Sequence, residues 1–150
     1  MRSRITLALL AFAILAAPAW AEDHDFKATA IYRLTSLTPV GDQLLIVAEG
    51  GGVSRILGPF TATATVTQDA VADPCWAYSA EFELVSSQGT LHLHSDGSVC
   101  AQPDMITGAW YVVSGTGAFA GATGSGVEQG KQSFVGSDPV VDQLDGTLSY

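Results

Sequence analysis

The chain has 150 residues, with 15 Asp and Glu against six Lys and Arg, and a formal net charge of −9 at neutral pH. Its length suits one domain with a single core. A surface this acidic repels nucleic acid and anionic membranes, so we expect neither as a partner.

Residues 1–21 have the pattern of an export signal. Arg2 and Arg4 precede an apolar run over 5–17, and the segment ends with Ala-Trp-Ala at 19–21, a small-x-small cleavage site. The run is too short to cross a bilayer of about 30 Å comfortably. We therefore predict a signal peptide over 1–21 and a single exported domain over 22–150, periplasmic or secreted and not inserted in a membrane.

The first strands follow the signal. Residues 26–35 mix aromatic, β-branched and threonine side chains, which predicts a strand that ends at a turn over 39–42. Residues 43–48 form a second, short apolar run. We expect the three glycines at 50–52 to break it or to bulge it.

A period of two is clearest over residues 59–68. Phe60, Ala62, Ala64 and Val66 share one face, and threonines occupy the other, which predicts a strand. Small alanines on the apolar face suit the interior of a narrow, closed barrel. A turn is expected over 69–74.

The next two segments predict a hairpin, because both alternate and a Ser-Gln-Gly turn at 87–89 separates them. Residues 78–85 place apolar side chains opposite Glu81 and Glu83. Residues 90–94 place two leucines opposite His92 and His94. Glu81 and Glu83 are therefore expected to lie across the hairpin from the two histidines, on the same face.

Five glycines punctuate residues 114–126, between strand-like runs over 105–114 and 122–129. They superficially resemble a dinucleotide fingerprint, but no helix can follow, because each interior glycine costs a helix about 1 kcal/mol relative to alanine. The glycines instead predict a turn and a sharply coiled strand. With a last run over 141–150, we predict seven or eight strands and no helix, hence an all-β barrel or sandwich.

This glycine segment also carries a family resemblance. Residues 115–126 resemble the Gly-Thr-Gly-x-Phe-x-Gly-Ala-x-Gly signature of the barrel superfamily that contains plant allene oxide cyclases, dirigent proteins and secreted bacterial proteins. Residues 57–61 and 145–150 resemble two further segments, in family order. The resemblance implies a closed antiparallel β-barrel of about eight strands and a homo-oligomer like the dirigent proteins. It carries over no catalytic residue, because no matched position belongs to an active-site motif.

Cys75 and Cys100 are the two cysteines of the chain. In an exported protein such a pair most simply forms one disulfide. The alternative, a thiolate nucleophile or a metal ligand, has less support because the chain has no Cys-x-x-Cys spacing.

Two sets of residues have metal-ligand chemistry. His92 and His94, with a facing glutamate, offer nitrogen and oxygen ligands for zinc or copper, although such pairs also occur on strands that simply face water. Glu22, Asp23 and His24 would place a histidine third from a free amine, which suits square-planar Cu(II) or Ni(II) if cleavage follows Ala21. Cleavage after Ala19 would remove that arrangement.

Our leading functional hypothesis is a non-enzymatic barrel that binds a small, mostly apolar molecule without a cofactor, since barrels of about eight strands have room for one. Trp110, Tyr111 and Phe119 are the candidate ligand-binding residues.

The alternative that the resemblance implies is a cofactor-independent isomerase or cyclase, assisted by a carboxylate or a tyrosine. Glu81, Glu83 and Tyr78 are the candidates for that role. A carboxylate inside an apolar cavity would favour this alternative, whereas Glu81 and Glu83 facing solvent would count against it. A structural, dirigent-like oligomer is the third hypothesis.

Overall fold

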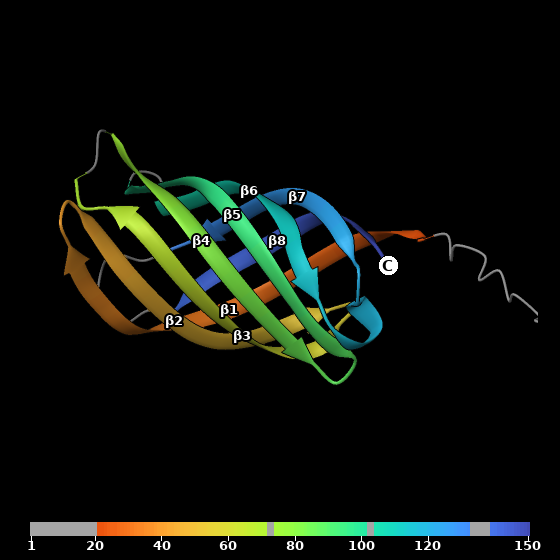
Figure 1. Cartoon of the computed structure of the whole chain (residues 1–150). Coiled ribbons are helices and arrows are strands. Elements are labelled where there is room, and N and C mark those ends of the chain that lie inside the picture. Colours follow the sequence, from red (N-terminus) through yellow and green to blue (C-terminus); the bar gives the residue numbers. More distant parts are fainter. Residues whose placement is uncertain (1–20, 72–73, 102–103, 133–138) are drawn as a thin grey trace, which may run out of the picture.

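A computed structural model describes residues 21–71, 74–101, 104–132 and 139–150. Within these residues the chain forms eight antiparallel strands that close into a barrel (Figure 1), which confirms the predicted fold class. Each strand pairs with the next, and pairing of β1 with β8 closes the sheet. The elements are β1 (Asp23–Val40), β2 (Gln43–Ser54), β3 (Gly58–Asp69), β4 (Cys75–Ser86), β5 (Gly89–Ala101), β6 (Asp104–Gly115), the 3-10 turn η1 (Gly117–Phe119), β7 (Thr123–Lys131) and β8 (Val140–Ser149).

The predicted signal peptide lies almost entirely in residues 1–20, outside the described residues, so export stays a prediction. Among the residues that are described, no helix has the length and apolar character needed to cross a membrane.

The antiparallel order gives the barrel two different ends (Figure 1). The turns after β2, β4 and β6 lie at one end, on the right of the figure, together with η1 and the C-terminus; we call it the closed end. The strands β1, β3, β5 and β7 end at the opposite end of the barrel, which we call the mouth. Large side chains with at most 1% exposure fill the closed end and the middle of the barrel: Phe26, Leu57, Leu84, Leu91, Leu93, Trp110, Phe119 and Leu148.

The predicted alternation is confirmed in the central strands. Phe60, Ala62 and Ala64 of β3 are at most 6% exposed and point inward, and Tyr78 and Phe82 of β4 do the same. The closed pairing explains this, because successive side chains of each strand must face either the interior or the solvent.

The expected break at residues 50–52 is wrong. β2 runs through all three glycines, and the register shift between β1 and β2 lies instead between Leu34 and Ser36. A Cβ at Gly50 would lie 1.9 Å from the carbonyl oxygen of Ile31. The glycines therefore let β1 and β2 approach closely where the wall of the barrel bends.

The glycines of residues 114–126 have the two roles that were predicted. Gly117 and Gly121 adopt φ values of +62° and +79°, which favour glycine, in the turn around η1. Gly126 faces Gly146 across β7 and β8. A Cβ at Gly146 would lie 2.8 Å from the Trp110 ring, so the missing side chain makes room for the buried indole.

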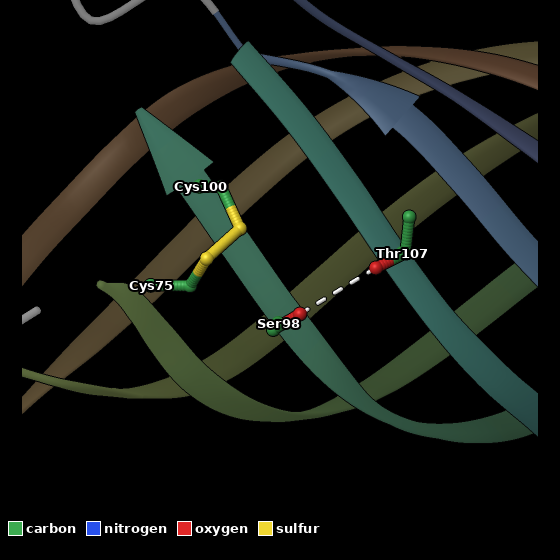
Figure 2. The surroundings of a disulfide bond; sticks show 4 residues. All are labelled: Cys75, Ser98, Cys100 and Thr107. Carbon is green, nitrogen blue, oxygen red and sulfur yellow. Dashed lines mark hydrogen bonds between the residues drawn. A yellow bond between two sulfur atoms is a disulfide. The ribbon is translucent and has the colours of Figure 1, made fainter. Parts of the chain in front are cut away.

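Cys75 and Cys100 form a disulfide (Figure 2), as predicted. They face each other across β4 and β5 at the mouth, with their Cα atoms 4.4 Å apart. Next to them on β5, the Ser98 hydroxyl lies 3.5 Å from the hydroxyl of Thr107 on β6 (Figure 2). Ser98 and Cys100 alternate with buried Val99, so the disulfide lies on the outer face of the barrel.

We predict that Cys75→Ser/Cys100→Ser lowers the free energy of unfolding by about 3 kcal/mol, because the bond closes a loop between residues 25 apart in the unfolded chain. Urea denaturation of the variant and of the reduced native protein measures this. Ser98→Ala, on the same outer face, is the control and should change stability by less than about 1 kcal/mol. An unchanged midpoint in the double variant would contradict the prediction.

Candidate functional site

The mouth half of the barrel contains a cavity of about 520 Å³. This volume lies within the range of small-molecule sites. Its wall is mostly apolar, and three alanines, Ala48, Ala64 and Ala80, contribute to it. The small side chains that predicted a narrow barrel thus also leave an open space inside it. The other lining residues are Tyr32, Arg33, Leu34, Leu37, Ile46, Val66, Gln68, Tyr78, Phe82, Val99, Ile106, Glu128, Gln132, Val140 and Asp142.

Tyr78 and Glu128, which both line this cavity, are connected by a row of four paired residues that we call the polar wall. Tyr78 of β4 pairs with Gly97 of β5, Gly97 pairs with Gly108 of β6, and Gly108 pairs with Glu128 of β7. A Cβ at Gly108 would lie 2.3 Å from the Tyr78 hydroxyl and 2.9 Å from that of Ser95. The two glycines therefore leave the space in which the tyrosine extends along the wall towards Glu128.

Two buried polar atoms of residues that line the cavity, Tyr78 Oη and Glu128 Oε2, have no hydrogen-bond partner among the described residues, and the same holds for Ser95 Oγ behind the wall. Their residues are 6%, 3% and 0% exposed. A buried polar group without a partner costs about 1–3 kcal/mol. The two atoms at the cavity are therefore suited to bind the polar part of a molecule inside it.

Asp142 of β8 completes the polar wall. It pairs with Gly130, two residues along β7 from Glu128, and is 4% exposed. Burial, together with the charge of Glu128 and a hydrogen bond to it, raises the pKa of Asp142 to about 8. At neutral pH Asp142 therefore keeps its proton and donates it in a hydrogen bond to Glu128.

Glu128 carries the negative charge of this carboxyl pair. Burial raises its pKa, and the polar side chains of Ser95, Tyr78 and Asp142 partly offset that effect. Burial also raises the pKa values of the phenols of Tyr78 and Tyr32, and both carboxylates add to the effect. Both tyrosines consequently stay protonated and can act as hydrogen-bond donors.

Of the predicted catalytic residues, Tyr78 lines the cavity but the two glutamates do not. The side chains of Glu81 and Glu83 are 61% and 51% exposed. They alternate along β4 with buried Phe82, so they point outward. By the criterion stated above, this counts against catalysis by these two residues, whereas two other carboxyls face the interior.

The predicted ligand-binding residues do not line the cavity. Trp110 is 1% exposed and packs edge-on against Phe26, with ring centres 5.3 Å apart. Phe119 is fully buried at the closed end, against Tyr150. Tyr111 is 49% exposed on the outer face. The turn that carries Phe119 is packed into the closed end, and the open space lies at the opposite end.

The hairpin pairing of Glu81 with His94 and of Glu83 with His92 is confirmed. His94 Nδ1 lies 2.6 Å from Glu81 Oε1, and its Nε2 lies 3.1 Å from Asp96 Oδ2. A histidine that donates from both ring nitrogens is an imidazolium, and the hydrogen bond to Glu81 is the main cause that raises its pKa.

Metal binding at the histidine pair stays a prediction. His92 Nε2 is 3.7 Å from Glu83 Oε2, while the two carboxylates at His94 lie against opposite ring nitrogens. The described ranges contain no group of three His, Cys, Asp or Glu side chains arranged to hold a metal ion.

The N-terminal metal hypothesis also stays a prediction, since it depends on cleavage after Ala21. Glu22 immediately precedes β1, and the Asp23 carboxylate accepts a hydrogen bond from the Ser149 hydroxyl. His24 pairs with Leu148, and its ring lies 4.8 Å from that of Tyr150. These contacts place the first residues of β1 in the sheet.

The polar wall itself was missed by reasoning from sequence. The alternation of β8 contains the signal that could have found it. Asp142 is separated by even numbers of residues from the apolar Leu144 and Leu148, so it lies on the same inward face as they do. Gly97 and Gly108 are lone glycines inside strands, a mark of close approach by another group.

No family model matches the chain, and no curated protein matches it. The resemblance to the allene oxide cyclase and dirigent superfamily therefore stays a prediction.

We predict that Gly108→Ala destabilises the protein by about 1–3 kcal/mol, because its Cβ would overlap the Tyr78 hydroxyl. Tyr78→Phe removes that oxygen and should recover part of the loss in the double variant. Urea denaturation of the two single variants and the double variant measures the coupling. Strictly additive losses would show that the tyrosine hydroxyl does not occupy this space.

The carboxyl pair also predicts a pH dependence of stability. The folded-state pKa of Asp142, about 8, lies above its ordinary value of 3.8, so the folded protein binds the extra proton between these values. Its contribution to stability is therefore lost as pH rises from about 4 to about 8. Asp142→Asn should flatten the pH dependence of the urea midpoint over this window. The pKa of His94 is also raised, so its contribution to stability falls as pH rises in the same way. His94→Gln is therefore the control that measures the part of the pH dependence due to His94. An equal slope in the native protein and Asp142→Asn would contradict the prediction.

Proposed function

We propose that this protein binds a small, mostly apolar molecule with one polar end in the mouth half of the barrel. The observation that carries the proposal is the cavity of about 520 Å³, whose mostly apolar wall includes two buried polar atoms that have no partner in the described part of the chain, Tyr78 Oη and Glu128 Oε2. Apolar walls supply most of the affinity for such a ligand, and a few polar groups fix its orientation.

The rim of the cavity supports an apolar ligand. Leu34 and Leu37 of β1 line the cavity, yet they are 57% and 51% exposed. Exposed apolar side chains at the edge of a cavity are typical of ligand-binding grooves, because an apolar ligand would cover them. Arg33 is the one cation among the residues that line the cavity, and no cation lies against the carboxyl pair in the described chain.

Export and family membership form part of the same proposal. The leader-like residues 1–21 and the disulfide support an exported protein. The eight-stranded barrel supports the resemblance to the allene oxide cyclase and dirigent superfamily.

A cofactor-independent isomerase or cyclase is the second candidate. It is favoured by one observation: Glu128 and Asp142 are carboxyl groups that face an apolar cavity. Burial keeps such groups reactive towards protons, whereas a plain binding site needs no carboxyl pair. Both candidates use the same cavity, and they differ in whether the bound molecule changes.

Filling the cavity tests the proposed function. Ala64 faces the cavity and is 4% exposed, while Thr65, the next residue of β3, faces solvent. We predict that the native protein enhances the fluorescence of N-phenyl-1-naphthylamine, a neutral apolar probe. Ala64→Phe should weaken its binding at least tenfold, because the ring occupies the ligand space. Thr65→Phe, the matched control, should bind as the native protein does.

Equal binding by both variants would place the probe on the outer surface and overturn the proposal. Absence of binding to the native protein would overturn it as well. Circular dichroism of each variant verifies that the barrel is intact.

A further inference from the structure

The polar wall of the cavity combines a proton acceptor with proton donors. Glu128 is the group whose charge raises the pKa of Asp142, and its Oε2 atom has no hydrogen-bond partner among the described residues. The Tyr78 hydroxyl lies over Gly108, directly across the strand pair from Glu128. Asp142 contributes a second protonated group on the other side of Glu128. A ligand at this wall would meet the Glu128 Oε2 atom as an acceptor and the Tyr78 hydroxyl as a donor.

The geometry gives this arrangement room for a substrate. Gly97 and Gly108 have no side chains, so the Tyr78 hydroxyl reaches across them towards Glu128. Apolar side chains form much of the remaining cavity wall, Ala48 of β2, Ala64 of β3 and Phe82 of β4 among them. An apolar molecule in this space would therefore press its polar atom against the wall.

We propose that the barrel interior catalyses proton transfer within small, apolar carbonyl compounds. Glu128 is the base that removes a proton from the carbon next to the carbonyl, and Tyr78 donates a hydrogen bond to the carbonyl oxygen. Asp142, whose proton is donated to Glu128, is a positioning residue that holds the Glu128 carboxylate in place. This inference rests on the proposed function, because the substrate must first bind in the cavity.

The step is complete without a cofactor or second substrate. The Glu128 carboxylate takes the proton, the electrons of the C–H bond form a carbon–carbon double bond, and the carbonyl π electrons move to oxygen. A hydrogen bond from Tyr78 stabilises the charge on that oxygen. Glu128 then returns the proton, either to the same carbon or to the far carbon of an adjacent double bond. The second course converts a β,γ-unsaturated ketone into its conjugated isomer.

The surroundings suit each group to its role. Burial in the barrel removes water from Glu128 and strengthens it as a base. The phenol of Tyr78 holds its proton, so it donates a hydrogen bond without becoming ionised. The groups that face Glu128 are Tyr78 of β4, Ser95 of β5 and Asp142 of β8. Tyr32 of β1 stands near enough for the charge of Glu128 to raise the pKa of its phenol.

Cyclohex-3-en-1-one is the test substrate, and its conversion to the conjugated cyclohex-2-en-1-one is followed by ultraviolet absorbance. Displacement of N-phenyl-1-naphthylamine measures its binding independently of turnover. We predict that the native protein accelerates the conversion above the buffer rate, and that the rate falls above about pH 8 as Asp142 loses its proton.

Three variants assign the roles. Glu128→Gln should lower the rate at least a hundredfold while the ketone still binds, because the amide cannot accept the proton. Tyr78→Phe should lower it about ten- to a hundredfold through loss of one donor. Glu49→Gln removes a carboxyl from the outer face of β2 and should leave the rate unchanged.

The possible results distinguish failure of the inference from failure of the proposed function. Binding with Glu128-dependent turnover supports the inference. Binding to the native protein without acceleration, or acceleration that survives Glu128→Gln in a folded variant, overturns the inference and leaves the proposed function standing. Failure of both the ketone and the naphthylamine probe to bind overturns the proposed function, and the inference with it. If Glu128→Gln does not fold, Tyr78→Phe is the test instead. An unchanged rate in Tyr78→Phe overturns the inference, because Tyr78 would then not be the hydrogen-bond donor of the reaction.

Discussion

Pairing of β1 with β8 is the constraint on which the rest of this structure depends. Once the sheet closes, every strand residue must face either a shared interior or the solvent, and no edge remains for unpaired backbone groups. The closed end satisfies this rule with large side chains such as Phe26 and Trp110. The mouth half satisfies it with alanines, which leave a cavity instead of a filled core.

Closure also explains why carboxyl groups are buried. Glu128 and Asp142 occupy inward positions on neighbouring strands, so the barrel brings them together away from water. Two carboxyl groups in such a place cannot both ionise without a large cost, and they share a proton instead. The pair is therefore held protonated in part by the fold itself. This property is the basis of the proposed contact with the polar end of a ligand and of the proposed proton transfer.

The fold was largely predictable because strand alternation is a local property. The period of two over residues 59–68 and 78–85 identified the inward side chains correctly, and the glycines around Gly117 marked a real turn. The interruption expected at residues 50–52 was wrong, because a glycine run also serves a sharply bent wall. Of the candidate catalytic and ligand-binding residues, only Tyr78 lines the cavity, because the cavity is formed by strands that are distant in sequence. Glu81 and Glu83 point outward and pair with His94 and His92 across the β4–β5 hairpin, so the local pattern identified a surface cluster and not the interior carboxyl groups.

By itself the sequence determined the strands, their inward faces and the turn glycines, since each depends on neighbours along the chain. It also determined the disulfide, because each of the two cysteines has a single possible partner in the chain. The location of the cavity and the meeting of Tyr78, Glu128 and Asp142 were decided by tertiary structure alone. These residues lie on β4, β7 and β8, and their contact requires the register of four strand pairs together with the absence of side chains at Gly97 and Gly108. No local pattern contains that information, because it arises only when the sheet curls and distant strands face one interior.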